Sequence, residues 1–196
     1  MFARRIRNDT MQILRPSDWH AQPWKNGRGV THEVYRLATA TSDDYDLRVS
    51  VAEIEGAQPF SLFRGYQRTL VALDESDLQL VVNGATMPLV RHQPLHFSGD
   101  VAVESQGVGR TRDLNVIART EIGAHVEVST TETPRHSPTA WPVMKARRLL
   151  VFALEATVLR CDDGSAAALE PFDTAVFPAG SAPTLEKSAL VVWVRF

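Results

Sequence analysis

The sequence predicts an all-β protein built from two related units in one chain. Apolar and polar residues alternate with period two in many short segments, as in strands that have one buried face. Glycine, proline, asparagine and aspartate interrupt these segments at short intervals, while helical periodicity is scarce. The third observation is an internal repeat, in which matching segments lie about 80 residues apart in the same order.

The predicted elements begin with a short helical turn at residues 16–19, and a strand is expected directly after Gly29. The first strand with a clear pattern covers residues 47–51, because its odd-numbered apolar residues share one face while Arg48 and Ser50 share the other. Further strands are expected at residues 69–73, 78–82, 101–104, 114–119, 124–129, 149–154, 157–160, 174–177 and 190–196.

The repeat also predicts how the chain is divided. The matching strands lie between residues 69 and 119 and between residues 149 and 196, so we expect an N-terminal unit at 11–129 and a second unit at 143–196. Residues 130–142 have the composition of a linker and are expected to connect the units. Residues 1–10 precede Met11 and are expected to be a disordered tail or the product of an upstream translation start.

Residues 169–180 resemble the turn, strand and Pro-x-Gly corner that is common in cupin barrels. The resemblance implies a bicupin, with two related β-barrel or jelly-roll units in one chain. Metal-binding cupins carry a histidine soon after this corner and a His-x-His upstream, but Gly180 is followed by Ser-Ala-Pro-Thr and the sequence has no His-x-His. His92 and His96 have Pro94 between them and cannot share a helical face. We therefore expect no metal and no cofactor.

Composition excludes several classes of partner. The formal net charge is −2 and the cations are interspersed with acidic residues, so neither nucleic acid nor a membrane is an expected partner. No segment approaches the roughly 20 apolar residues of a membrane span, and the basic residues near the N-terminus precede no apolar signal region. Cys161 is the single cysteine, which favours a reducing cytoplasm and excludes an intramolecular disulfide.

Arginines, amides and aromatic residues gather at predicted strand ends and in one glycine loop. The glycines at 27 and 29 allow a ligand or another chain segment to approach the backbone closely. Arg112 and Asp113 are a candidate ion pair at the start of a strand. A single arginine is more often solvated than buried, but one that faces a barrel lumen would offer a fork matched to a carboxylate.

Several motifs in order resemble the HutD/Ves family of small bacterial cytoplasmic proteins. They are Trp24-Lys-Asn-Gly27 with Gly29-Val-Thr31, residues 47–53, residues 59–63, Gly65 with Arg68-Thr-Leu70, Phe97-Ser-Gly-Asp100 and Arg112-Asp-Leu-Asn115. The resemblance covers residues 13–119 and continues less distinctly to the C-terminus. It implies a two-unit cupin-like fold, a regulatory or ligand-sensing role in histidine utilization, and a pocket for a small carboxylate. Arg28 stands where relatives carry glycine, which either strains the loop or adds a cation at its rim.

The residue pattern and the resemblance together give a set of candidate ligand-binding residues: Trp24, Lys25, Asn26, Gly27, Arg48, Glu53, Phe60, Ser61, Arg68 and Asn115. No catalytic residue is assigned. The expected partner is a small anionic metabolite such as urocanate or formiminoglutamate, bound without metal, and a homodimer is a further option. Bidentate arginine pairing is the geometry-specific interaction that these residues offer to a carboxylate.

Three alternatives remain open at this point. The protein could be a metal-independent enzyme in which Glu53 or a histidine acts as a general base, although nearby arginines would lower the pKa of a carboxyl group and weaken it as a base. It could have the stress-related role of the Ves branch of the family. It could also be an interaction module without a ligand, in which case Arg48 and Arg68 would be paired internally and no cavity would lie between them.

Overall fold

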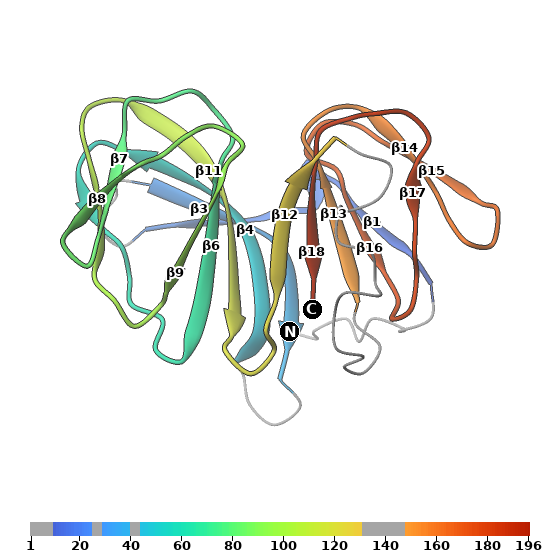
Figure 1. The fold of residues 1–196 in the computed structure, drawn as a ribbon, viewed down its shortest axis with the longest axis horizontal. Coiled ribbons are helices and arrows are strands. Elements are labelled where there is room, and N and C mark those ends of the chain that lie inside the picture. Colours follow the sequence, from blue (N-terminus) through green and yellow to red (C-terminus); the bar gives the residue numbers. More distant parts are fainter. Residues whose placement is uncertain (1–9, 25–28, 40–43, 131–147) are drawn as a thin grey trace. The chain divides into compact units, whose positions relative to one another are not determined.

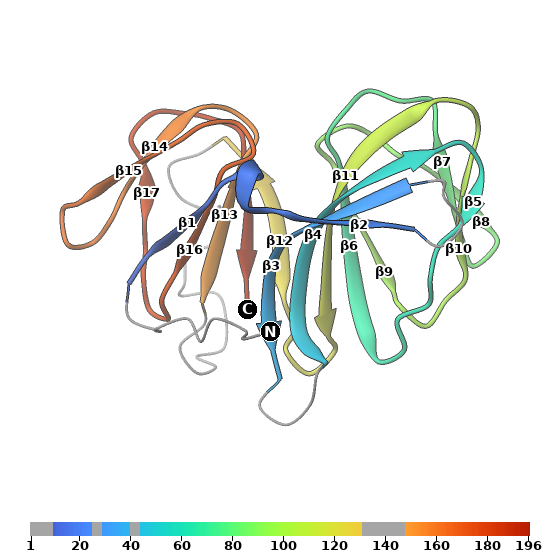
Figure 2. The ribbon, with the colours of Figure 1, turned by 180° about the vertical axis from the view of Figure 1, so that it is seen from behind.

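The computed structural model describes residues 10–24, 29–39, 44–130 and 148–196, and these form an all-β fold of two compact units. Residues 16–128 form the first, which we call the central unit. Residues 10–15 and 129–196, as far as they are described, belong to the second, which we call the terminal unit. Figures 1 and 2 show both units from opposite sides. One turn of 3-10 helix, η1 (Pro16–Asp18), occurs, and no described helix is long and apolar enough to cross a membrane.

The central unit consists of two antiparallel sheets. The larger has the strand order β2-β3-β4-β11-β6-β9 and the smaller the order β5-β10-β7-β8. Their bounds are β2 (His20–Pro23), β3 (Gly29–Ala38), β4 (Tyr45–Glu55), β5 (Gln58–Pro59), β6 (Tyr66–Ala72), β7 (Gln79–Val82), β8 (Ala85–Pro88), β9 (Pro94–Ser98), β10 (Val103–Gln106) and β11 (Arg110–Arg119). Leu70 and Ala72 of the larger sheet pack against Leu80 and Val103 of the smaller one, so the two sheets share an apolar core.

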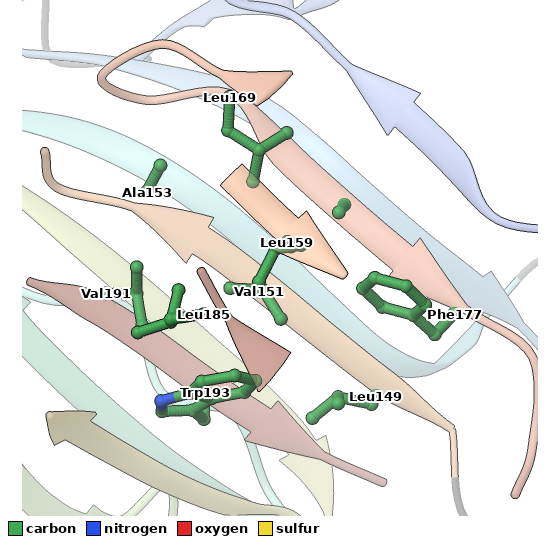
Figure 3. Packing of buried hydrophobic residues seen from close by; sticks show 10 residues of the cluster. Leu149, Val151, Ala153, Leu159, Leu169, Phe177, Leu185, Val191 and Trp193 are labelled. Atoms are coloured by element: carbon green, nitrogen blue, oxygen red, sulfur yellow. The ribbon is translucent and has the colours of Figure 1, made fainter. Parts of the chain in front are cut away.

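The terminal unit is built in the same way but is filled with apolar side chains. One sheet contains β1 (Gln12–Leu14), β16 (Thr174–Phe177), β13 (Leu149–Ala153) and β18 (Val191–Arg195) in this order. The other has the order β15 (Ala166–Leu169), β14 (Thr157–Arg160), β17 (Thr184–Leu185). Figure 3 shows Trp193 and Val151 among the aliphatic side chains of this core, where Trp193 is 1% exposed. The chain passes from one unit to the other at the end of β12 (His125–Ser129).

The N-terminal strand differs from the predicted grouping, which placed residues 11–129 together. β1 pairs with β16, so residues 10–15 belong to the terminal unit. Ile13 packs against the apolar core of that unit, and Arg15 Nη1 lies 3.1 Å from Asp173 Oδ2. A strand of three residues is too short for its alternation to reveal its partner. Only residue 10 of the predicted tail at 1–10 and residue 130 of the predicted connection at 130–142 are described. The rest of both segments lies outside the described residues.

Most predicted strands are present with shifted ends, and 157–160 and 174–177 agree with β14 and β16. The prediction omitted β1, β2, β5, β8, β9, β15 and β17. Most of these are short or exposed, and all four residues of β8 face solvent. Without a buried face such a strand carries no alternation of apolar and polar residues, so pattern reasoning cannot find it.

Candidate functional site

Three neighbouring strands of the central unit present polar side chains on one face. β11 lies between β4 and β6, and its Ile117 is paired with Arg48 on one side and Arg68 on the other. Two residues earlier on β11, Asn115 is paired with Ser50 and Leu70. Two residues earlier again, Asp113 is paired with alanines on both strands. Because alternate residues of a strand and paired residues of adjacent strands share a face, these side chains point to the same side of the sheet.

This face lines a cavity of about 480 Å³, within the size range of small-molecule sites. Its charged and amide lining comes from Arg48, Arg68, Asp113, Asn115 and Gln22, with Ser50 beside them. The apolar wall comes from the larger sheet and from the segment that enters β6, and includes Trp24, Ile54, Phe60, Phe63 and Ile117. The cavity therefore combines a few converging polar groups with an aromatic wall.

Arg68 is buried although it carries a charge. It is 4% exposed, and its Nη1 donates a hydrogen bond of 3.3 Å to the Ser61 carbonyl oxygen. Its guanidinium carbon lies 5.3, 5.1 and 5.1 Å from the ring centres of Phe60, Phe63 and Phe97. Its Nε has no hydrogen-bond partner among the described residues. The pKa of Arg68 is lowered to about 10, chiefly by burial; the charge of Asp113 opposes the shift and that of Arg48 adds to it, so the side chain stays cationic at neutral pH.

Arg48 also lies over the Phe63 ring that Arg68 contacts. Its guanidinium carbon is 5.2 Å from the centre of the Phe63 ring and 5.2 Å from that of Tyr45. Its buried Nε has no hydrogen-bond partner among the residues that the structure describes. Two cations therefore lie within cation–π distance of one phenyl ring, and no carboxylate among the described residues is paired to either of them. An anion placed between them would relieve their mutual repulsion and take up the free donors.

Asp113 and Asn115 add buried acceptors to a cavity that Gln22, Ser50 and Ser61 also line. Asp113 is completely buried, and neither of its carboxyl oxygens has a hydrogen-bond partner in the described part of the chain. Burial raises the pKa of Asp113 to about 7, while the positive charge of Arg68 opposes the rise. Asn115 Oδ1 is also buried and unpartnered. Buried polar atoms without partners are rare in native proteins, so these oxygens are acceptors that a ligand or solvent in the cavity could engage.

The glycine loop begins with a tryptophan that is fixed from two sides. Trp24 Nε1 donates a hydrogen bond of 2.8 Å to Thr31 Oγ1, and the Trp24 backbone N–H donates to the Gly29 carbonyl at 2.9 Å. A Cβ at Gly29 would lie 2.6 Å from the Glu53 carbonyl oxygen and 2.9 Å from the Trp24 ring. A glycine here could admit either a ligand or another segment of the chain. At Gly29 it is the chain itself, through Glu53 and Trp24, that lies close to the backbone. Lys25, Asn26, Gly27 and Arg28 lie outside the described residues.

The segment that carries Phe60, Ser61 and Phe63 is fixed by Gly99. Phe63 N–H donates to the Gly99 carbonyl and Gly99 N–H donates to the Tyr66 carbonyl, each at 2.8 Å. A Cβ at Gly99 would lie 2.2 Å from the Phe63 carbonyl oxygen. The aromatic wall of the cavity therefore depends on a glycine that does not line the cavity.

Replacing Gly99 with alanine should displace this segment and lower the free energy of unfolding by about 1–3 kcal/mol, the usual effect of overpacking. Urea unfolding of the purified variant measures the change. Ser98→Ala is the matched control, because it removes only the two exposed hydrogen bonds between Ser98 Oγ and Asp100, and should change stability by less than about 1 kcal/mol. A Gly99→Ala variant as stable as the wild type would contradict the steric argument.

Two sequence-based assignments in this region need correction. Glu53 does not line the cavity, because it alternates with Ala52 and Ile54 on β4 and points to the other face, where its Oε1 lies 3.8 Å from His32 Nε2. Arg112 does not pair with Asp113, because neighbours on a strand point to opposite faces; it forms two hydrogen bonds of 2.9 and 2.7 Å with Asp74.

The structure brings together Trp24, Arg48, Phe60, Ser61, Arg68 and Asn115 from the predicted set. Prediction missed Asp113, Ser50 and Phe63 as lining residues. The signal for Asp113 was available, since it lies two positions before Asn115 on one strand. No group of three or more His, Cys, Asp or Glu side chains in the described ranges is arranged to hold a metal ion.

Comparison with known proteins gives one family. The profile of the HutD family matches residues 16–192. An uncharacterized 21.2 kDa protein in the hutC 3′ region of Pseudomonas putida is 38% identical over 109 residues, which are 55% of this chain and 57% of that protein. Protein Ves of Citrobacter koseri is 40% identical over 100 residues, 49% of this chain and 51% of that protein. The chain thus spans about half the length of the curated relatives it matches.

Solved structures agree with this result. A conserved protein from Pseudomonas aeruginosa PAO1 has a TM-score of 0.78 and 29% identity, covering 95% of this chain and 98% of that chain. HutD from Pseudomonas fluorescens SBW25 has a TM-score of 0.71 and 25% identity, covering 94% and 98%. A cupin 2 conserved barrel domain protein from Leptotrichia buccalis, at 9% identity, has a TM-score of 0.56 and covers 85% and 88%. The last likeness concerns the fold alone, which is cupin-like.

Proposed function

The chain belongs to the HutD family, and from this membership and the chemistry of its cavity we propose that it binds a small carboxylate between Arg48 and Arg68. The observation that carries the proposal is the pair of guanidinium groups, both at about 5 Å from the Phe63 ring, facing a cavity of about 480 Å³ with Nε donors that have no partner in the described ranges. Guanidinium and carboxylate groups match in geometry and form charge-assisted hydrogen bonds. A metal is not needed for this interaction.

The alternative of an interaction module without a ligand predicted arginines paired with internal carboxylates and no cavity between them. No ion pair within 4 Å involves Arg48 or Arg68 among the described residues, and both line the cavity. Burying a cation without a counter-charge is unfavourable, and a bound anion would offset that cost. A binding site therefore explains why the two arginines line the cavity, whereas a purely structural role would leave the cost of burying their charges without compensation.

Thermal unfolding with added urocanate, formiminoglutamate, formylglutamate and glutamate tests the proposal. A ligand at a hundredfold excess over its Kd stabilises the folded state by about 2.7 kcal/mol, which shifts Tm by several degrees. Arg48→Ala should abolish the shift. Arg110→Ala is the matched control, because Arg110 is exposed on the other face of β11 and pairs with Glu55, and it should leave the shift unchanged. The absence of a shift with every compound would count against carboxylate binding.

We propose further that binding serves regulation of histidine utilization. The support is the family membership and the location of the Pseudomonas putida relative in the hutC 3′ region. A stress-related role of the Ves type is the alternative, and the 40% identity to protein Ves of Citrobacter koseri supports only the kinship with that branch. A deletion strain should show altered expression of histidine-degrading enzymes during growth on histidine. Unchanged expression there, with a defect under stress, would favour the Ves-type role.

An enzyme that acts on the same carboxylate is a second candidate. Glu53 is outside the cavity, but Asp113 is inside it, and burial raises the pKa of its carboxyl group to about 7. A group that titrates near neutral pH is suited to general acid–base catalysis. Conversion of one of the four compounds by the wild type, lost in Asp113→Asn, would rank this candidate first; recovery of unchanged compound after long incubation would reject it.

We also propose that the two units are diverged copies of one cupin-like unit. In the central unit β6 pairs with β11 so that Leu70 faces Asn115, and in the terminal unit β13 pairs with β18 so that Val151 faces Trp193. If these pairs are equivalent, a buried tryptophan occupies in one copy the position of the amide in the other. One copy would then have kept a cavity while the other filled it.

A further inference from the structure

The cavity has a second polar end that a simple carboxylate would leave unused. Asp113 and Asn115 contribute three buried oxygen atoms without hydrogen-bond partners among the described residues. All three are acceptors when Asp113 is ionised. The arginines offer only donors, so the cavity is divided into a donor end and an acceptor end.

The two ends follow from the register of the sheet. Arg48 and Arg68 flank Ile117, whereas Asp113 lies four residues away on the same strand, about 13 Å along it. Both arginine side chains are long and Arg68 extends far enough to act on the pKa of Asp113. Donors and acceptors therefore lie at successive positions along the sheet within one cavity.

The charges of the residues that line the cavity also favour a ligand with different functional groups at its two ends. The charged groups in the cavity lining are Arg48 on β4, Arg68 on β6 and Asp113 on β11, and Tyr45 adjoins both arginines. A ligand with two carboxylates would put one of them against the Asp113 carboxyl group. A ligand with one carboxylate and one N–H donor would pair each end with its complement.

We propose that the ligand carries a carboxylate at one end and an N–H donor at the other, and that Asp113, with Asn115 beside it, selects for this donor. The inference rests on the proposed function, since it assigns the second end of the same site. Suitable donors are a heteroaromatic ring N–H, an amidine or amide N–H, and an ammonium group. Asp113 is thus a specificity-determining residue that contacts the ligand directly.

Matched pairs of compounds test the inference on the wild-type protein by titration calorimetry. Urocanate is compared with trans-3-(3-furyl)acrylate, which has the same chain and ring size but no ring N–H. 4-Aminobutyrate is compared with butyrate, which keeps the carboxylate and lacks the ammonium group. A site built around a donor rejects the analogue without it strongly, so in at least one pair we expect the N–H compound to bind at least tenfold more tightly.

Variants of Asp113 test whether this residue causes the difference in affinity between the two compounds of a pair. Asp113→Leu removes the acceptor at similar volume and should reduce the ratio of affinities within the pair to near one, while affinity for the analogue stays or rises. Asp113→Asn keeps one acceptor and serves as the second variant if the leucine variant does not fold. Ser98→Ala, outside the cavity, should retain the wild-type ratio.

The outcomes separate the two proposals. Equal binding of both members of each pair would overturn the donor end and leave carboxylate binding intact. A tenfold ratio that persists in both Asp113 variants would overturn the role of Asp113. If no member of either pair binds, carboxylate binding itself fails, and the inference fails with it.

Discussion

Replacing Arg68 with methionine should abolish carboxylate binding while leaving the unliganded protein as stable as the wild type or more stable. The binding loss follows from the position of Arg68, which supplies one of the two guanidinium groups in the cavity. Truncating one partner of a buried, hydrogen-bonded charge pair typically costs 2–5 kcal/mol, which is a loss of affinity of roughly 30-fold to several thousandfold.

The stability effect has the opposite sign for a physical reason. Arg68 makes one hydrogen bond of 3.3 Å and leaves its Nε unpartnered in the described structure, so its charge is poorly compensated in the empty cavity. The lowered pKa of Arg68 expresses the same penalty. Methionine fills a similar length with apolar atoms against three phenylalanine rings, and replacing a buried charge in this way is often neutral or stabilising by about 1–4 kcal/mol.

Urea unfolding and titration calorimetry on the same preparation measure both effects. Arg110→Met is the control, because that side chain is exposed and pairs with Glu55, and it should change neither quantity by much. The experiment is best done at pH 6, where Asp113 is mostly protonated and does not lose a counter-charge. A marked loss of stability in Arg68→Met would mean that Arg68 serves the fold, and the case for a binding site would weaken accordingly.

The strands on which the site is built could be predicted because they are long and regular. β4 and β11 each contain ten or more residues, and their alternation places Arg48 and Asn115 on defined faces. Including Glu53 among the lining residues and omitting Asp113 both departed from that alternation. Counting in twos from Arg48 leads to Ser50 and Ala52 and excludes Glu53; counting in twos from Asn115 leads to Asp113.

Other parts of the site could not be read from the sequence. Phe60, Phe63 and Phe97 converge on Arg68 because the segment before β6 is held by Gly99, and such a contact depends on loop geometry. The pairing of β4, β11 and β6 side by side also had to come from the structure, since alternation gives the face of each strand but not its neighbours. The burial of Asp113 follows from that pairing.

Stability should fall as pH rises through neutrality because of Asp113, and Asp113→Asn should remove this dependence. Burial raises the pKa of Asp113 from its ordinary value of 3.8 to about 7 in the folded protein. Between these two values the folded state binds a proton that the unfolded state has lost, so the stability contributed by the protonated form is complete below about pH 4 and is lost as pH rises through 7.

The expected size is about 1.4 kcal/mol per pH unit within this window. Asp44, Asp74 and Asp163 have lowered pKa values, and their contributions have the opposite sign, since that stability is lost as pH falls through the lowered pKa values. The informative quantity is therefore the difference between variant and wild type, in which these other groups cancel.

Urea unfolding of both proteins at pH 5, 6, 7 and 8 gives this difference. Relative to the wild type, Asp113→Asn should gain about 2–3 kcal/mol between pH 5 and pH 8, with most of the gain below pH 7. The absolute offset between the two proteins does not matter, because the amide changes hydrogen bonding equally at every pH. Asp100→Asn, at an exposed carboxyl group, is the control for removing one carboxylate from the chain. A pH-independent difference for Asp113→Asn would mean that the carboxyl group ionises as it does in water, and that water or an ion reaches it in the empty cavity.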